Sequence, residues 1–259
     1  MSGEVHTLQF ASLGSGSKGN STVVRAGETL VMVDCGFSLR DTLRRLARLD
    51  IAPEQLDAIL VTHEHSDHCS GVAALSRKFE IPVYMTHGTS GTGRCDNSHD
   101  LHCFNCEDTF TIGALSIKAV AVPHDAAEPC QYRISWQDHT LGILTDLGSI
   151  TPHVVDNYRS CDSLLLEFNH DVSMLQNGQY PPHLKRRVGG DWGHLNNDQA
   201  ADFLRQIDSE SLRQVVVAHV SENNNSRERA EGALLSVLGS LDKVVFAQQS
   251  EGFDWLKIA

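Results

Sequence analysis

Four side chains of the types that bind metal ions fall within six positions of the chain: His63, His65, Asp67 and His68. His63 and His65 are two residues apart, so in an extended segment both point to the same side. Imidazole and carboxylate groups suit zinc, manganese or iron, but one cation could hardly use all four from so short a segment. The spacing favours two neighbouring cations, the first on His63 and His65 and the second on Asp67 and His68. The alternative interpretation is a polar loop that happens to be rich in histidine.

The element in front of this segment is an apolar strand, and the same arrangement recurs along the chain. We expect strands within 56–62, 109–122, 140–144 and 214–218, and a potential ligand follows each of them: His63, His124, Asp146 and His219. Ligands at the same end of several strands converge on one edge of the sheets. Asp146 suits a bridge between two cations, because each of its carboxylate oxygens can bind one.

The remaining apolar pattern predicts an α/β protein, because strand, helix and strand follow one another around the histidine-rich segment. Further strands are expected at 8–13, 22–25, 29–33, 81–85, 131–136, 162–166, 244–246 and 253–257. Helices are expected at 38–49, 72–79, 172–176 and 226–238, with another that begins near 196–197 and ends at 207. The length allows one domain of two packed sheets or two small domains, and no Pro/Gly/Ser-rich linker divides the chain.

Residues 88–106 do not follow either periodicity, and we expect a small insertion or a mobile loop beside the site. The stretch contains Cys95, His99, His102, Cys103 and Cys106. A structural zinc site is the alternative interpretation, although a second Cys-x-x-Cys pair is lacking.

Composition limits the class of protein. The hydrophobic fraction of 41% and the charged fraction of 21% are ordinary for a soluble globular chain. No apolar run approaches the length of a membrane span and no signal segment is visible, so we expect a cytoplasmic protein without a membrane partner. The seven cysteines are irregularly spaced, which argues against a secreted disulfide framework. The net charge of −12 speaks against a broad surface for nucleic acid, so attraction of a phosphodiester must be local.

Two segments are candidates for such local contacts. The glycine-rich loop 14–21, with Ser15, Ser17 and Asn20, lacks the Gly-Lys-Ser/Thr ending of a phosphate loop, so we expect a turn whose N–H groups can still face an anion. The basic cluster 183–187 contains Lys185 and Arg186. It is either a solvated face or a set of phosphate contacts.

Three polar positions allow both a structural and a functional interpretation. Glu167, at the end of a strand, either lies near the metals or belongs to a segment that caps the next helix. His194 is either structural or a proton donor. Asn196 is a predicted helix cap and a further candidate for substrate contact.

The segment His63-Glu64-His65-Ser66-Asp67-His68 after a strand is also the signature of the metallo-β-lactamase superfamily, which this sequence resembles. The resemblance implies an αββα sandwich, two mixed sheets packed face to face with helices outside, as a single domain over 1–259. It implies a first cation on His63, His65, His124 and Asp146, and a second on Asp67, His68, Asp146 and His219. Asp34, with Glu167, would lie just outside the ligands and orient them.

Further stretches resemble the YycJ/WalJ-like group of that superfamily: Ser15–Ser21, Thr145–Gly148, Glu167–Asp171, Tyr180-Pro181, Leu184-Lys185, Gly193–Asn197 and His219–Ser221. That group is cytoplasmic and bacterial, is related to the phosphodiesterase PhnP and to ribonuclease Z, and includes 5′-to-3′ DNA exonucleases. The stretch 88–105 does not match it.

The resemblance implies a hydrolase of phosphodiesters, with DNA as the candidate substrate and zinc, manganese or iron as the two cations. A hydroxide between the cations would attack phosphorus, with Asp67 and His194 as catalytic residues and His194 as the acid. A phosphodiesterase of small cyclic or nucleotide substrates is the main alternative, ahead of a thioesterase of the glyoxalase II type and a non-catalytic metal-binding protein. No oligomeric state is predicted.

Overall fold

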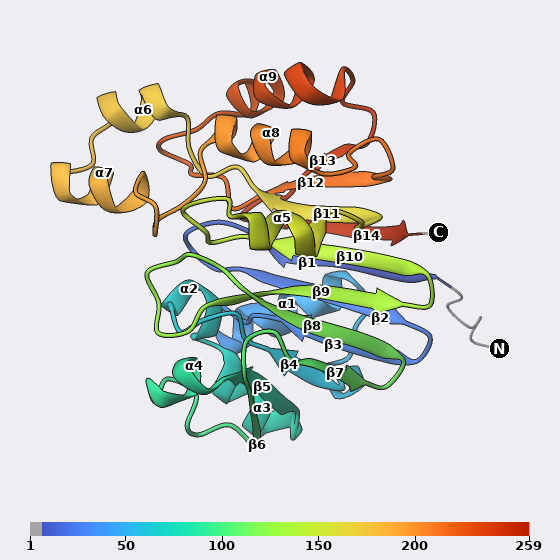
Figure 1. Ribbon diagram of the computed structural model, residues 1–259. Helices are drawn as coiled ribbons and strands as arrows, with labels where there is room; N and C mark the ends of the chain where they lie inside the picture. Colours follow the sequence, from blue (N-terminus) through green and yellow to red (C-terminus); the bar gives the residue numbers. More distant parts are fainter. Residues whose placement is uncertain (1–6, 259) are drawn as a thin grey trace.

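The computed structural model describes residues 7–258 and folds them into two β-sheets of seven strands each (Figure 1). The first sheet, in spatial order, contains β14 (Phe253–Ile258), β1 (Leu8–Gly14), β2 (Ser21–Ala26), β3 (Thr29–Val33), β4 (Ala58–Leu60), β5 (Pro82–Thr86) and β6 (Asp100–Phe104). The second contains β13 (Val244–Phe246), β12 (Gln214–Ala218), β11 (Ser163–Glu167), β10 (His139–Leu144), β9 (Cys130–Trp136), β8 (Leu115–Ala121) and β7 (Thr109–Ile112).

Each sheet is mixed. Strands β3 to β6 are parallel, whereas β14, β1, β2 and β3 pair antiparallel. In the second sheet, β10 to β13 are parallel and β7 to β10 are antiparallel. The parallel strands place the segments that follow them at one edge, where α2 (Ser66–Cys69) and the connections to α6 (Val172–Asn177) and α7 (Pro182–Val188) lie, on the left of Figure 1.

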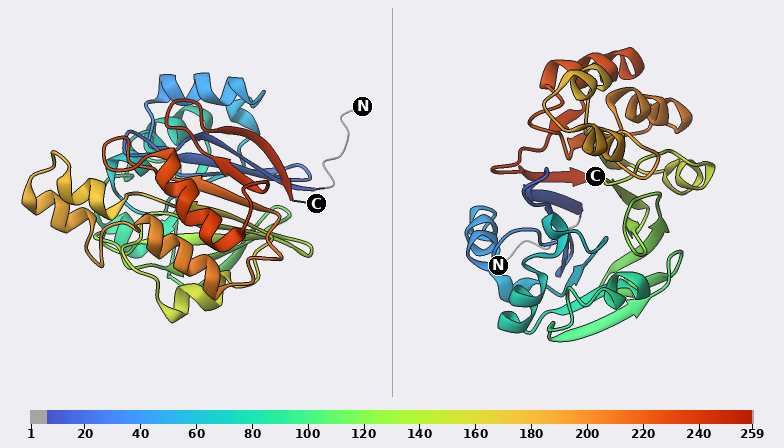
Figure 2. Two further views of the ribbon diagram at one scale, coloured as in Figure 1. Left: turned by 90° about the horizontal axis from the view of Figure 1, so that it is seen from above. Right: turned by 90° about the vertical axis from the view of Figure 1, so that its left-hand side faces the viewer.

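Helices cover the outer face of both sheets, so the layers run helix, sheet, sheet, helix (Figure 2). The first sheet packs against α1 (Leu39–Arg48) and α3 (Val72–Phe79), and the second against α5 (Pro152–Tyr158), α8 (Asn197–Gln206) and α9 (Arg227–Leu238). A third apolar cluster fills the space between the sheets and includes Phe10, Val31, Tyr132 and Ile143. The remaining elements are the 3-10 turn η1 (Pro53–Gln55) and α4 (His87–Gly91).

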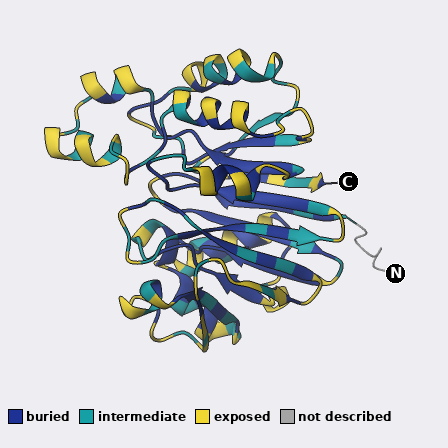
Figure 3. Ribbon diagram, viewed as in Figure 1, coloured by how far each residue is buried: buried dark blue, intermediate teal, exposed yellow. Residues whose placement is uncertain are grey.

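The burial pattern explains why the central strands read as continuous apolar runs. All five residues of β3 are buried, because one face meets the second sheet and the other meets the outer helices. In Figure 3 the central strands are largely buried, whereas α6 and α7 are mostly exposed. Side-chain caps begin the helices that flank the site: Asp171 accepts a hydrogen bond from Met174 N at α6, and Asn196 accepts one from Gln199 N at α8.

The predicted fold class, two mixed sheets face to face with helices outside, is confirmed. The segment 88–106 differs from the expected loop or insertion, because 100–104 form β6, the edge strand beside β5. An edge strand needs no continuous apolar run, and four of its five residues are exposed or half-buried. Helices α5 and α7 were not expected. Within residues 7–258, no helix combines the length and apolar character that crossing a bilayer requires.

Candidate metal centre

The ends of six strands deliver the candidate site. Asp34 follows β3, the His63–His68 segment follows β4, His124 follows β8, Asp146 follows β10, Glu167 ends β11 and His219 follows β12. Asp34, Asp146 and His219 adopt positive φ values of 60°, 54° and 51°. The left-handed region is unfavourable for residues with a side chain, and such strain concentrates at functional sites. Here the backbone turns sharply as it leaves the strand.

Three imidazole nitrogens form the first group of potential ligands. The Nε2 atom of His63 lies 3.0 Å from the Nδ1 atom of His65, and the Nε2 atom of His124 lies 3.2 Å from that same Nδ1 atom. Three nitrogens at this separation can share one cation. The segment that follows β4 of the first sheet and the segment that follows β8 of the second therefore meet at a single point.

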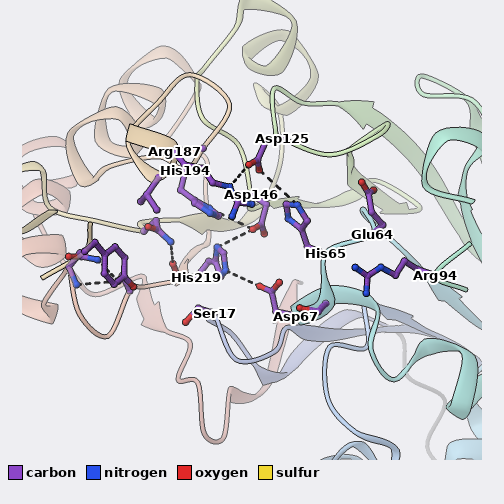
Figure 4. Close-up of a pocket in the computed structure, with 17 residues that line it drawn as sticks. Ser17, Glu64, His65, Asp67, Arg94, Asp125, Asp146, Arg187, His194 and His219 are labelled. Atoms are coloured by element: carbon purple, nitrogen blue, oxygen red, sulfur yellow. Dashed lines mark hydrogen bonds and ion pairs between the residues drawn. The ribbon is translucent and has the colours of Figure 1, made fainter. Parts of the chain in front are cut away.

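Two imidazoles and two carboxylates form the second group. The Nε2 atom of His68 lies 3.4 Å from the Oδ2 atom of Asp67 and 3.3 Å from the Oδ2 atom of Asp146, and the Nε2 atom of His219 lies 3.7 Å from Asp67 Oδ2. The two groups adjoin, because the rings of His63 and His68 are 4.2 Å apart and Asp146 is within ligand range of both histidines. Figure 4 shows Asp67, Asp146, His65 and His219 facing one another across the site.

Hydrogen bonds of the Nδ1 atoms, on the side of each ring away from the cluster, fix the orientation of these histidines. His68 Nδ1 donates to Asp34 Oδ2 (2.8 Å), and His124 Nδ1 donates to the carbonyl of Gly193 (3.0 Å). Thr62 Oγ1 donates to Asp34 Oδ2 (2.8 Å) and so accepts from His63 Nδ1 (3.0 Å). With Nδ1 as the donor, each ring directs its Nε2 atom at the cluster, the orientation that a metal ligand requires.

Glu167 performs the same role for two rings at once. Its Oε1 atom accepts from His219 Nδ1 (2.7 Å) and from His194 Nδ1 (2.9 Å), while its Oε2 atom accepts from the backbone N–H of Leu195 (2.9 Å). The sequence left open whether Glu167 lies near the metals or belongs to a helix-capping segment. Asp171 is the residue that caps α6, whereas Glu167 is fully buried beside the cluster. His194 is 21% exposed, so its Nε2 side can meet a substrate.

Burial and the nearest charge act in the same direction on the pKa of His63 but in opposite directions on the pKa values of the two buried carboxylates. Burial, followed by the nearby His68, lowers the pKa of His63 well below its usual value. Burial alone would raise the pKa of Glu167, but His194 and His219 outweigh it and hold the pKa at about 2. Burial would also raise the pKa of Asp146, but His219 and His68 hold it well below its usual range. The carboxylates are therefore anionic oxygen ligands among imidazoles.

This donor set fits divalent cations. The Oδ2 atom of Asp146 and the Nε2 atom of His219 are buried, and within residues 7–258 neither has a hydrogen-bond partner of acceptable geometry. Buried polar atoms are almost always paired, so two unpaired ligand atoms aimed into one cluster indicate a cation as their partner. The site lacks thiolate ligands in either group, which suits zinc, manganese or iron alike.

A cavity of about 520 Å³ opens over the cluster and is lined by Ser17, Asp67, Asp146, His194 and His219. Among the described residues, its arginines are Arg94, which the sequence did not single out, and Arg187, which lies in the predicted basic cluster 183–187 but was not named individually. Arg187 pairs with Asp125, the residue after His124. The sequence did not predict a helix over 182–188. In that helix Arg187 lies about 200° around the axis from Lys185, so the two side chains face different sides.

Most of the predicted substrate contacts have other partners. Ser15 Oγ accepts from His219 N (2.9 Å), Asn20 binds the 67–68 segment, and Asn196 caps α8. Lys185 Nζ donates to the carbonyl of Gln176 (2.8 Å), and the exposed Arg186 does not line the cavity. The first four of these side chains are therefore positioned to hold the loops of the site, and Ser17 is the one predicted contact that faces the cavity.

The cysteines and histidines of the 88–106 stretch are dispersed. Cys95 is buried against α3, Cys103 is exposed on β6, and no group of potential ligands found among residues 7–258 includes a side chain from this stretch.

Comparisons with known proteins give a consistent result. A family model described as a beta-lactamase superfamily domain matches residues 29–220. Exodeoxyribonuclease WalJ of Streptococcus pneumoniae serotype 2 is 34% identical over 242 residues, which cover 91% of this chain and 90% of that protein. Exodeoxyribonuclease YycJ of Bacillus anthracis is 33% identical over 236 residues, which cover 89% of each chain.

Among solved structures, the metallo-beta-lactamase fold protein YhfI from Bacillus subtilis superimposes with a TM-score of 0.77 at 16% identity, covering 97% of this chain and 99% of that one. At that identity the likeness concerns the fold. The relatives and the fold agree with the resemblance drawn from the motifs.

Proposed function

Because this chain belongs to the β-lactamase superfamily, we propose that it is a metal-dependent phosphodiesterase that degrades DNA from the 5′ end. Two relatives that each cover about nine-tenths of the chain carry the name exodeoxyribonuclease. The observation that carries the proposal is the convergence of five imidazoles and two carboxylates, with the outer nitrogens of His63, His68, His124 and His219 already hydrogen-bonded.

Each group of ligands would hold one divalent cation: zinc, manganese or iron. His63, His65 and His124 would hold the first, and Asp67, His68 and His219 the second, with Asp146 between them. A pair of such cations lowers the pKa of a water molecule towards neutrality and takes up negative charge that develops on phosphate oxygens. Because the ligands come from both sheets, we further propose that residues 1–259 act as one domain.

The protein's own contribution to the chemistry centres on His194. Its Nδ1–H donates to Glu167 Oε1, so the ring is held with Nε2 towards the cavity. In that orientation a protonated Nε2 can pass its proton to the leaving oxygen as the P–O bond breaks. The same carboxylate oxygen of Glu167 also accepts from His219 Nδ1, so one side chain fixes both rings.

The acidity of the chain favours a second candidate, hydrolysis of small phosphodiesters. A net charge of −12 repels a polyanion at long range, whereas a cyclic or mononucleotide diester carries a single charge.

Labelled DNA separates the two candidates. A 5′-labelled single strand given to the zinc-, manganese- or iron-loaded protein should release labelled mononucleotide at once, while a 3′-labelled strand shortens progressively. The Asp67→Asn variant, prepared in the same way, controls for contaminating nucleases and should be inactive. Turnover of bis-p-nitrophenyl phosphate without digestion of either strand would assign the protein to small diesters, and turnover of a thioester alone would reject phosphodiester chemistry altogether.

A further inference from the structure

The guanidinium of Arg94 is a positive charge at the cavity that the machinery described so far does not use. Arg94 is exposed, lines the catalytic cavity, and makes no ion pair or hydrogen bond with any residue of 7–258. Figure 4 shows it on the side of the ligands opposite Arg187, below Glu64 in that view.

Other cations near the site are already paired. Arg187 bonds Asp125, and Lys18 bonds Glu222. Arg94 is therefore the arginine of the cavity whose charge is free to meet a ligand. In a chain of net charge −12, an unpaired arginine beside Glu64 and Asp67 is a local attraction for an anion.

The neighbours of Arg94 hold its backbone in place. Cys95 is 2% exposed and packs in the cluster between the first sheet and its outer helices. Arg77 on α3 donates to the carbonyl of Asn97 (2.7 Å), and His99 N donates to Ser76 Oγ (2.9 Å). Gly93, with φ of 75°, supplies the left-handed turn immediately before Arg94. The loop that the sequence left unassigned thus carries a cationic side chain to the cavity on a fixed backbone.

We propose that Arg94 binds the phosphate next to the scissile one, and so selects substrates with at least two consecutive phosphodiesters. This inference rests on the proposed phosphodiesterase function. In the proposed function the scissile phosphate would lie over the metal ligands, whereas Arg94 lines the cavity away from them beside Glu64. A guanidinium offers a planar pair of donors that matches two phosphate oxygens. The substrate class is then a polynucleotide strand rather than an isolated diester.

A length series tests the inference. Unphosphorylated thymidine oligonucleotides of two, three and four nucleotides contain one, two and three phosphodiesters, and the readout is the gain in kcat/KM as the second phosphate is added. The wild-type protein should show a clear gain. Arg94→Ala should reduce that gain about 10-fold, the scale of one hydrogen-bonded charge contact, with the loss in KM. Arg94→Lys should recover part of it.

Salt supplies an independent readout. Loss of one phosphate contact on a single strand should flatten the plot of log(1/KM) against log salt concentration by about 0.7. Arg40→Ala is the matched control, since it removes the same charge from an exposed position on α1 outside the cavity. It should keep both the length gain and the wild-type salt slope.

The outcomes separate this inference from the function on which it rests. If the wild-type protein cleaves these strands but gains nothing from the second phosphate, or if Arg94→Ala keeps the wild-type gain and slope, Arg94 is not a phosphate contact and the phosphodiesterase stands. An equal loss in Arg40→Ala also overturns the inference, because net charge alone would explain it. If the metal-loaded wild-type protein cleaves no phosphodiester, both fall together.

Discussion

Replacing Glu167 by Gln keeps the shape of the side chain but changes what it can accept. The buried carboxylate accepts four N–H groups: His219 Nδ1 (2.7 Å), His194 Nδ1 (2.9 Å), Leu195 N (2.9 Å) and Leu147 N (3.4 Å). A glutamine has one oxygen, so its amide must face either the two imidazoles or the two backbone donors. Either orientation leaves donors unpaired in a fully buried place.

The size of the effect follows from these contacts. Each unpaired buried donor costs about 1–3 kcal/mol, so the metal-free variant should lose a few kcal/mol of unfolding free energy. Loss of the carboxylate that orients a ligand histidine typically weakens metal binding by about 10- to 100-fold. Because Glu167 also holds His194, kcat should fall by about 100-fold even at saturating metal.

Three measurements check this: competition of the protein with a metal indicator, urea unfolding without metal, and kcat at saturating metal. Glu107→Gln is the matched control, because Glu107 also accepts from a histidine (His153 Nε2, 2.8 Å) and a backbone N–H (Ala121, 3.0 Å), but at a partly exposed position. It should change stability by less than about 1 kcal/mol and leave metal affinity alone. Wild-type metal affinity and stability in Glu167→Gln would refute the reasoning.

Other substitutions probe separate parts of the account. His194→Ala should lower kcat by about 10²–10⁴ with full metal content, whereas His219→Ala should lose metal by elemental analysis; equal metal loss in both would show that their roles are misassigned. Gly36→Ala would place a Cβ 1.7 Å from the carbonyl oxygen of Asp67, so the His63–His68 segment must shift. The variant should lose about 1–3 kcal/mol of unfolding free energy in urea and bind metal more weakly. An unchanged unfolding curve would contradict this packing. Glu80→Gly, at a helix end with φ of 56°, should raise the unfolding free energy by about 0.5–1 kcal/mol, and no gain by the same measurement would count against backbone strain there.

The candidate metal ligands were accessible from sequence because the segments that carry them follow apolar strands. His124 and His219 lie far from His63 in the chain, yet the end-of-strand pattern predicts that they meet, and the structure brings them together. Period-2 and period-3.6 patterns also predicted most of the elements in both sheets. Buried strands and amphipathic helices can be predicted because the residues that face the core must be apolar, which produces a regular pattern in the sequence.

Contacts that depend on local geometry were not accessible. Glu167 serves two histidines through one oxygen, which follows from the positions of β11, β12 and the 193–195 segment rather than from a motif. Arg94 follows a glycine-rich stretch without periodicity, and its backbone is fixed at the cavity by the burial of Cys95 and by hydrogen bonds of the following residues to α3. The exposed edge strand β6 and the charged helix α7 bury little, so their sequences carry no apolar pattern.

Anomalous diffraction from crystals of the active, metal-loaded protein tests the central claim most directly. We predict two peaks, one among His63, His65 and His124 and the other among Asp67, His68 and His219, with Asp146 adjoining both. The same preparation of Asp146→Ala should lose at least one peak together with phosphodiesterase activity. Full activity with both peaks absent, or with Asp146→Ala as active as the wild type, would contradict the account.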